Sequence, residues 1–261
     1  MVQHIRGFIL PLSDRPSAQL ALDNRAYCLP VMDQEFLLGD STRGIRFQLE
    51  YQKAEETLRS VNIESTIVVF GSARVKEDDA HGWYEGARQF AKLCSLQGGA
   101  KSKHAPYQNV IATGGGPGIM EAANRGAYDA GALNIGFNIK LPHEQEPNPY
   151  STPDLTFLFH YFAMRKMHFA MRAAALVVFP GGFGTLDELF ELLTLRQTGK
   201  MMKNLPVVLY DSKFWKSAIN FEHFAKEKLI NPKDLDLFTF ADTPDATWKS
   251  LLDRGLLIPK E

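Results

Sequence analysis

Three clusters of glycine each follow a run of apolar residues in this sequence: Gly71-Ser72, Gly114-Gly115-Gly116 and Gly181-Gly182. Glycine has no Cβ, so its backbone can approach a ligand closely, and a helix N-terminus just beyond it presents unpaired N–H groups to an anion. "TGGGPGIMEAA" (113–123) and "PGGFGTLDEL" (180–189) both have this form. The pattern therefore predicts a phosphate-bearing ligand. Tight strand-to-helix packing without a ligand is the alternative.

The spacing of the glycines narrows the class of ligand. A dinucleotide fingerprint needs G-x-G-x-x-G and an acidic residue about 20 positions later. Gly114, Gly116 and Gly118 have a different spacing, and the next apolar run ends in Asn138-Ile139-Lys140 without a carboxylate. No G-x-x-x-x-G-K-[ST] occurs either. A single nucleotide or a sugar phosphate is therefore favoured over NAD or a P-loop nucleotide.

Charged residues near the third glycine cluster could carry chemistry. Thr185 and Glu188 have the S/T-x-x-E spacing of a capping box, which is a purely structural role. If the glycines hold an anion instead, Glu188 lies one helical turn from a bound phosphate and can face a sugar. Arg165 and Arg172 are seven residues apart, on one face of the preceding helix. An arginine at the ligand end of that helix can bind phosphate through two N–H groups.

Regular alternation of strands and helices positions these residues. We expect strands at 65–74, 107–118, 132–139, 155–162, 175–182 and 205–211, and helices at 81–97, 119–130, 164–174, 185–197 and 213–228. Short β-branched runs alternating with helices predict an α/β fold, a Rossmann-like doubly wound parallel sheet with helices on both faces. Such folds bind ligands beyond the carboxyl ends of the strands, where the strand order reverses.

The chain is expected to have two parts. Residues 1–60 have scattered prolines and charges and then an exposed helix at 46–60, so we interpret them as an N-terminal extension. Residues 61–261 form the Rossmann-like nucleotide-binding domain.

Composition excludes several classes of protein. The formal net charge of −1 gives no basic excess for a nucleic-acid partner. Two cysteines are too few for a disulfide framework, and no apolar run approaches the roughly 18 residues of a membrane span. We expect a cytoplasmic protein. No His/Cys cluster suggests a metal.

Three motifs together resemble the LOG (LONELY GUY) family: "GGGPGIM" (114–120), "MRKMHFAM" (164–171) and "PGGFGTLDE" (180–188). The family has GGG-x-x-G-x-M and PGG-x-GT-x-x-E motifs, with an Arg-Lys pair 15 residues before the second motif, an interval that Arg165 and Pro180 keep. The resemblance covers roughly residues 65–219. It implies a phosphoribohydrolase, which cleaves the N-glycosidic bond of AMP or of a cytokinin riboside 5′-monophosphate. The family was formerly labelled lysine decarboxylase, but no lysine here is marked as a Schiff-base former.

The resemblance also implies roles for particular residues. Arg165 and Glu188 correspond to the catalytic pair. Glu144 corresponds to a glutamate that contacts the ribose or base, with Glu146 as the other candidate. No cofactor is implied. The substrate-binding residues that the resemblance implies are Ser72, Gly115, Gly116, Gly118, Glu144, Met164, Lys166, Gly181, Gly182, Gly184, Thr185 and Thr194.

Two further expectations concern function and assembly. A non-enzymatic carrier of a phosphorylated ligand such as molybdenum cofactor would need the phosphate cradle but not the Arg165–Glu188 pair, so the pair favours the enzyme. The resemblance implies a homodimer or a higher homo-oligomer. Met164, Met167 and Met171 form one apolar stripe that could be a contact surface, as could the helix at 46–60, although core packing and a solvated helix explain them equally well.

Overall fold

The computed structural model describes residues 18–22, 24–102, 106–142, 146–201 and 205–259. The chain divides into two compact units, Met1–Gln48 and Leu49–Glu261. None of the helices in the described ranges is long and apolar enough to cross a membrane.

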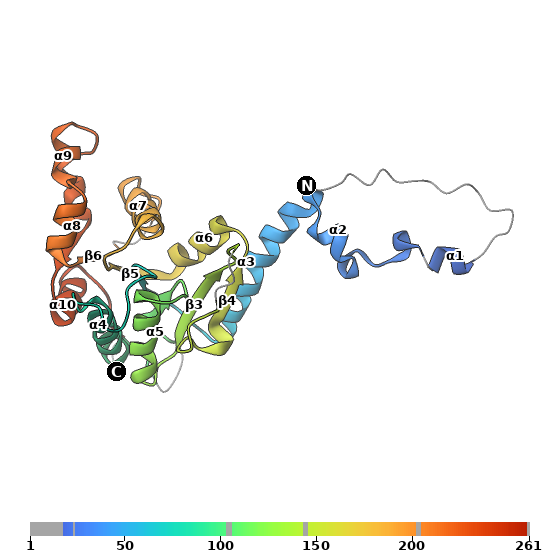
Figure 1. The fold of residues 1–261 in the computed structure, drawn as a ribbon, viewed down its shortest axis with the longest axis horizontal. Coiled ribbons are helices and arrows are strands. Elements are labelled where there is room, and N and C mark those ends of the chain that lie inside the picture. The colour runs from blue at the N-terminus through green and yellow to red at the C-terminus, as the bar shows by residue number, and fades with distance from the viewer. Residues whose placement is uncertain (1–17, 23, 103–105, 143–145, 202–204, 260–261) are drawn as a thin grey trace. The chain divides into compact units, whose positions relative to one another are not determined.

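The second unit contains a seven-stranded sheet in which all paired strands are parallel, in the order β4-β3-β2-β1-β5-β6-β7. This confirms the predicted doubly wound α/β fold. The order reverses between β1 and β5, which is where such sheets bind ligands. Figure 1 labels strands β3, β4, β5 and β6 of this sheet. The strands are β1 (Thr66–Phe70), β2 (Val110–Thr113), β3 (Asn134–Ile139), β4 (Thr156–Phe159), β5 (Ala173–Val178), β6 (Val207–Tyr210) and β7 (Thr239–Ala241).

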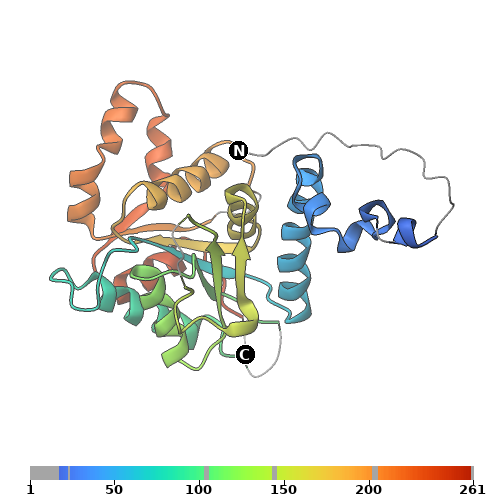
Figure 2. The ribbon, with the colours of Figure 1, turned by 45° about the vertical axis from the view of Figure 1, so that its right-hand side comes forward.

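Helices cover both faces of this sheet (Figure 2). Strand side chains alternate between the faces, so Val68 packs on the side of α3, α6, α7, α8 and α9, and Ile67 on the side of α4, α5 and α10. The helices are α3 (Arg43–Ser60), α4 (Trp83–Gln97), α5 (Ile119–Asp129), α6 (Phe162–Arg172), α7 (Phe183–Gln197), α8 (Ser212–Ala218), α9 (Phe221–Lys226) and α10 (Pro244–Asp253), with 3₁₀ turns η4 (Pro153–Leu155) and η5 (Pro232–Leu237).

The C-terminal part of the domain differs from the sequence-based expectation at three places. The single helix expected at 213–228 is two helices, because the side chain of Asn220 accepts a hydrogen bond from the backbone N–H of His223 at 3.0 Å and starts α9. The strand β7 and the helix α10 were not predicted. β7 is only three residues long. The sequence signal for α10 is the Thr243-Pro244 pair at its start.

A buried ion pair joins α3 to α6. Arg172 Nη1 lies 2.7 Å from Glu55 Oε2, and both side chains are nearly buried. The Arg172 guanidinium lowers the pKa of Glu55 below the usual range. Arg172 Nε also donates to the carbonyl of Ile63 at 3.2 Å. Arg172 is therefore a structural residue, although it lies on the same helix as Arg165.

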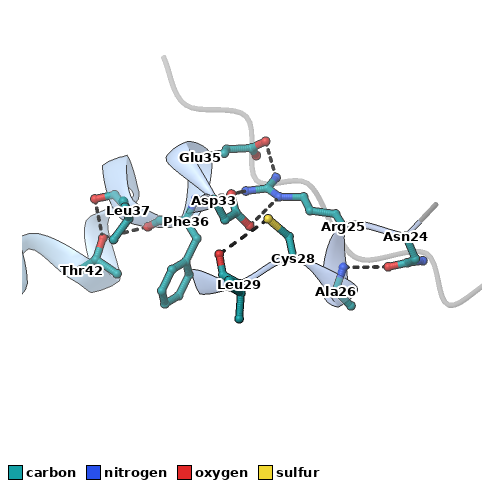
Figure 3. A network of polar contacts seen from close by, with 10 residues as sticks. All are labelled: Asn24, Arg25, Ala26, Cys28, Leu29, Asp33, Glu35, Phe36, Leu37 and Thr42. Carbon is teal, nitrogen blue, oxygen red and sulfur yellow. Dashed lines mark hydrogen bonds and ion pairs between the residues drawn. The ribbon is translucent and has the colours of Figure 1, made fainter. Parts of the chain in front are cut away.

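The first unit is built from short helices: α1 (Ala18–Leu22), η1 (Arg25–Tyr27), η2 (Pro30–Met32), α2 (Gln34–Leu38), η3 (Asp40–Thr42) and the start of α3. Figure 3 shows the polar contacts that hold it. Arg25 donates from Nη2 and Nε to the two carboxylate oxygens of Asp33 at 2.7 and 3.0 Å, and it also pairs with Glu35. These contacts lower the pKa of Asp33.

Candidate active site

A cavity of about 750 Å³ opens at the carboxyl ends of the central strands. Its walls come from the turns after β1 and β2, the end of β3, the first turn of α6, and the turn that leads from β5 into α7. It therefore lies at the point where the strand order reverses. The three glycine clusters share one edge of the sheet, as the sequence predicted.

Arg165 and Glu188 form an ion pair in this cavity. Arg165 Nη2 lies 2.8 Å from Glu188 Oε1, and their side chains are 13% and 6% exposed. The guanidinium of Arg165 also lies over the rings of Phe162 and Phe169, with its central carbon 5.3 and 5.8 Å from the ring centroids. α6 and α7 thus hold both charged groups in one fixed arrangement.

Burial dominates the electrostatics of Glu188. Removal of the carboxyl from water raises its pKa above the usual range, and the positive charge and hydrogen bond of Arg165 offset only part of this effect. A buried carboxylate with a raised pKa, in a cleft and beside one specific cation, is typical of a functional group.

The capping-box interpretation of Glu188 is not supported by the geometry. α7 begins at Phe183, and its N-cap residue is Gly182, which has no side-chain cap hydrogen bond. Thr185 lies inside the helix, so Glu188 is not paired with a capping residue. The first turn of α7 therefore presents its N–H groups to the cavity.

The glycines of the β2 turn are explained by close contacts within the protein. Gly118 has φ 72°, and a Cβ there would lie 2.4 Å from the carbonyl oxygen of Ser72. Gly115 has φ 67°, and a Cβ there would lie 2.3 Å from the side-chain amide of Asn138. A Cβ on Gly181 would likewise lie 2.1 Å from Thr185 Oγ1.

Gly182 and Gly184 are different. No atom of the described chain lies within 4 Å of a Cβ built on either residue, apart from the immediate neighbours and the helix's own backbone. Both residues line the cavity. Protein packing therefore does not require glycine at these two positions, and the absence of a side chain leaves their backbone open toward the cavity.

Hydrogen bonds join the turns that form the cavity. The N–H of Ser72 donates to the carbonyl of Pro180 at 3.0 Å, and the N–H of Ile119 donates to the carbonyl of Ser72 at 3.1 Å. A Cβ on Gly114 would lie 3.8 Å from Arg165 Nη1, so the β2 turn also reaches the ion pair. The turns after β1, β2 and β5 are thus held together as one unit.

The structure brings many of the predicted site residues together. Those that line the cavity are Ser72, Gly116, Arg165, Gly182, Gly184, Thr185 and Glu188. Gly115, Gly118 and Gly181 belong to the same turns and pack behind its surface. Glu144 lies outside the described residues, while Glu146 is described and exposed.

Three predicted residues lie away from the cavity lining. Lys166 Nζ pairs with Asp187 Oδ1 at 2.7 Å and with Glu191 Oε2 at 2.9 Å. Thr194 donates its hydroxyl to the carbonyl of Phe190 in its own helix. Met164 is half-buried against the hydrophobic core.

Several residues that line the cavity were not among the predicted site residues, and they include Arg74, Asn138, Phe162 and Phe183. Arg74 follows the first glycine turn by two positions, which is the signal that could have identified it. Phe183 is 93% exposed, and its position inside the second motif could have indicated a residue that faces the ligand. Asn138 and Phe162 carry no comparable signal.

Known proteins are similar to this chain in sequence and in fold. Residues 120–251 match the family described as "Possible lysine decarboxylase". Cytokinin riboside 5′-monophosphate phosphoribohydrolase LOG3 of Arabidopsis thaliana is 25% identical over 62% of this chain and 82% of its own length.

Among solved structures, the structural-genomics target TM1055 has a TM-score of 0.51 at 17% identity, over 72% of this chain and 99% of that chain. This likeness shows the fold alone. The molybdenum cofactor carrier protein of Chlamydomonas reinhardtii has a TM-score of 0.48 at 24% identity, over 73% of this chain and 99% of that chain. Because the family match covers about half of the chain and its relatives include LOG phosphoribohydrolases, the chain belongs to the LOG family, whose description is possible lysine decarboxylase.

Proposed function

We propose that this protein is an N-glycosidase that hydrolyses a nucleoside 5′-monophosphate to free base and ribose 5-phosphate. The substrate is AMP or a cytokinin riboside 5′-monophosphate. The observation that carries this proposal is the nearly buried Arg165–Glu188 pair in a glycine-lined cavity at the strand-order switch. The name of the LOG3 relative supports the same reaction.

Glu188 supplies the chemistry. In glycoside cleavage, positive charge develops at the anomeric carbon and the ring oxygen, and a nearby carboxylate stabilises it. The bond from C1′ to the base nitrogen breaks with its electrons going to the base, which then takes up a proton. Water bonds to C1′ and loses a proton to Glu188, whose raised pKa suits a general base.

The main partner of Arg165 is the carboxylate of Glu188. Its Nη2 donates directly to the carboxylate, so it orients that group and favours its ionised form. The phosphate of the substrate lies against the first turn of α7, where Gly182 and Gly184 leave the backbone open and the helix N-terminus attracts an anion.

A lysine decarboxylase is not supported by the residues in the cavity. Among the described residues, no lysine lines it. Lys166 is adjacent to Arg165 in sequence, but its ammonium group pairs with two carboxylates of α7.

The test is product analysis with the purified protein of 261 residues. Incubation with AMP, GMP, CMP and isopentenyladenosine monophosphate is followed by chromatography of free base and ribose 5-phosphate. We expect release of base from at least one adenine nucleotide. Tight binding of a monophosphate without release of base from any of them would contradict the hydrolase and favour a carrier of a phosphorylated ligand.

A further inference from the structure

We propose that Arg74 binds the 5′-phosphate of the substrate, and that Arg165 is reserved for Glu188. This inference rests on the proposed function, because it assigns the phosphate-binding cation in the same cavity. The two arginines come from different elements: Arg74 lies in the turn after β1, and Arg165 in the first turn of α6.

Arg165 has little positive charge left to offer a phosphate. Its Nη2 donates to the carboxylate of Glu188 at 2.8 Å, and its side chain is only 13% exposed. Its flat face lies over two phenylalanine rings. A guanidinium paired with a buried carboxylate forms a unit with no net charge, and a phosphate that displaced the carboxylate would leave Glu188 buried and unpaired.

Arg74 has the opposite environment. Its side chain is exposed at the cavity, and in the described part of the chain no carboxylate pairs with it. The charged residues that line the cavity within that part are Arg74, Arg165 and Glu188. Arg74 is therefore the cation in this lining whose charge no protein group neutralises.

The backbone of Arg74 is held at the correct edge of the cavity. Its N–H donates to Ser72 Oγ at 3.1 Å, and the N–H of Ser72 donates to the carbonyl of Pro180 at 3.0 Å. Pro180 directly precedes Gly181 and Gly182, which lead into α7. The turn that carries Arg74 thus lies against the turn that opens the N-terminus of α7.

The charge of the ligand requires such a group. A phosphate monoester has a charge of about −1.5 to −2 at pH 7, and a helix N-terminus supplies only about half a positive charge. A guanidinium can donate two parallel N–H bonds to phosphate oxygens. Arg74 and the first turn of α7 together bind the phosphate, so that Arg165 and Glu188 remain available to act at the sugar.

The test compares Arg74→Ala, Arg74→Lys and a matched control, Lys76→Ala, each in the protein of 261 residues. Lys76 is an exposed cation of the same loop that does not line the cavity. Steady-state kinetics with AMP are combined with calorimetric binding of AMP and of adenosine, which lacks the phosphate. We expect Arg74→Ala to raise KM for AMP by about ten- to a hundredfold with kcat changed by less than about threefold.

The control and the other ligand separate a phosphate contact from a structural role. Lys76→Ala should keep KM for AMP, Arg74→Lys should recover part of the loss, and adenosine binding should not change in Arg74→Ala. A KM for AMP within about twofold of the wild type overturns the proposal, and so does an equal loss of AMP and adenosine binding.

The calorimetry also distinguishes this inference from the proposed function. If the wild type binds AMP but releases no base, the hydrolase is contradicted, and the role of Arg74 is decided by binding alone. AMP binding that is at least about tenfold weaker in Arg74→Ala supports it. Equal binding in the variant, or no AMP binding by the wild type, overturns it.

Discussion

Alanine substitutions at two glycines should have opposite effects, because the two positions differ in what surrounds them. At Gly118, φ is 72° and ψ is −130°, and a Cβ would lie 2.4 Å from the carbonyl oxygen of Ser72 and 2.8 Å from the carbonyl carbon of Ala73. These neighbours are backbone atoms, so they cannot rotate away. At Gly182, φ is −99° and no atom of the described chain lies within 4 Å of a Cβ, immediate neighbours aside.

The magnitudes follow from these surroundings. Backbone strain of this kind costs about 1–3 kcal/mol, and the clash adds to it, so Gly118→Ala should lower the free energy of unfolding by at least about 3 kcal/mol. For a chain of this size that corresponds to a fall in Tm of about 6–12 °C. Gly182→Ala should change the free energy of unfolding by no more than about 1 kcal/mol, because the gain from a more restricted unfolded chain is offset by the loss of glycine at the N-cap of α7.

Gly182→Ala should lower activity even though it leaves the protein stably folded. Its methyl group would occupy the space through which the phosphate approaches the first turn of α7, so we expect kcat/KM for AMP to fall by at least about tenfold in a fully folded protein. Thermal denaturation and AMP hydrolysis are measured on both variants. Wild-type activity in Gly182→Ala would refute the assignment of the phosphate to this turn. A wild-type Tm in Gly118→Ala would refute the contact between the β1 and β2 turns.

Two further predictions concern the charged groups. The active form of Glu188 is the carboxylate, and burial raises its pKa. As the pH is lowered, kcat/KM for AMP should therefore begin to fall at a higher pH than it would with an ordinary glutamate. A pH–rate profile whose acid limb lies at the usual glutamate pKa would contradict this. Arg172→Ala should cost up to about 3–5 kcal/mol in chemical denaturation, because it removes the buried partner of Glu55 and leaves that carboxylate only the mostly exposed Arg59. Arg59→Ala keeps the buried partner and should cost about 1 kcal/mol or less. Equal costs for the two variants would contradict this prediction.

Local patterns in the sequence predicted the sheet and the edge on which the glycines lie. Each expected strand is present, because short apolar runs that alternate with helices leave few arrangements other than a parallel sheet. The predictions failed where one side chain decided the outcome. Asn220 ends one helix and starts the next, and the three residues of β7 form a strand only because β6 lies beside them.

The sequence predicted which turns form the candidate site, but it did not predict the directions in which their side chains point. Arg165 and Lys166 are neighbours in sequence, yet about 100° apart around a helix, so one faces Glu188 and the other faces Asp187 and Glu191. The turn that carries Arg74 is held by the hydrogen bond from the N–H of Ser72 to the carbonyl of Pro180, which joins two turns far apart in the sequence. Motif spacing carries no information on such contacts.

The central claim is that the carboxylate of Glu188 stabilises the sugar during cleavage of the glycosidic bond. The most direct measurement is kcat for AMP hydrolysis by Glu188→Gln, which keeps an oxygen acceptor for Arg165, beside Asp187→Asn, which removes the neighbouring carboxylate that pairs with Lys166. We predict that Glu188→Gln lowers kcat by about 10²–10³ in a protein that remains folded, while Asp187→Asn keeps kcat within about threefold of the wild type. Near-wild-type turnover by folded Glu188→Gln would contradict the claim.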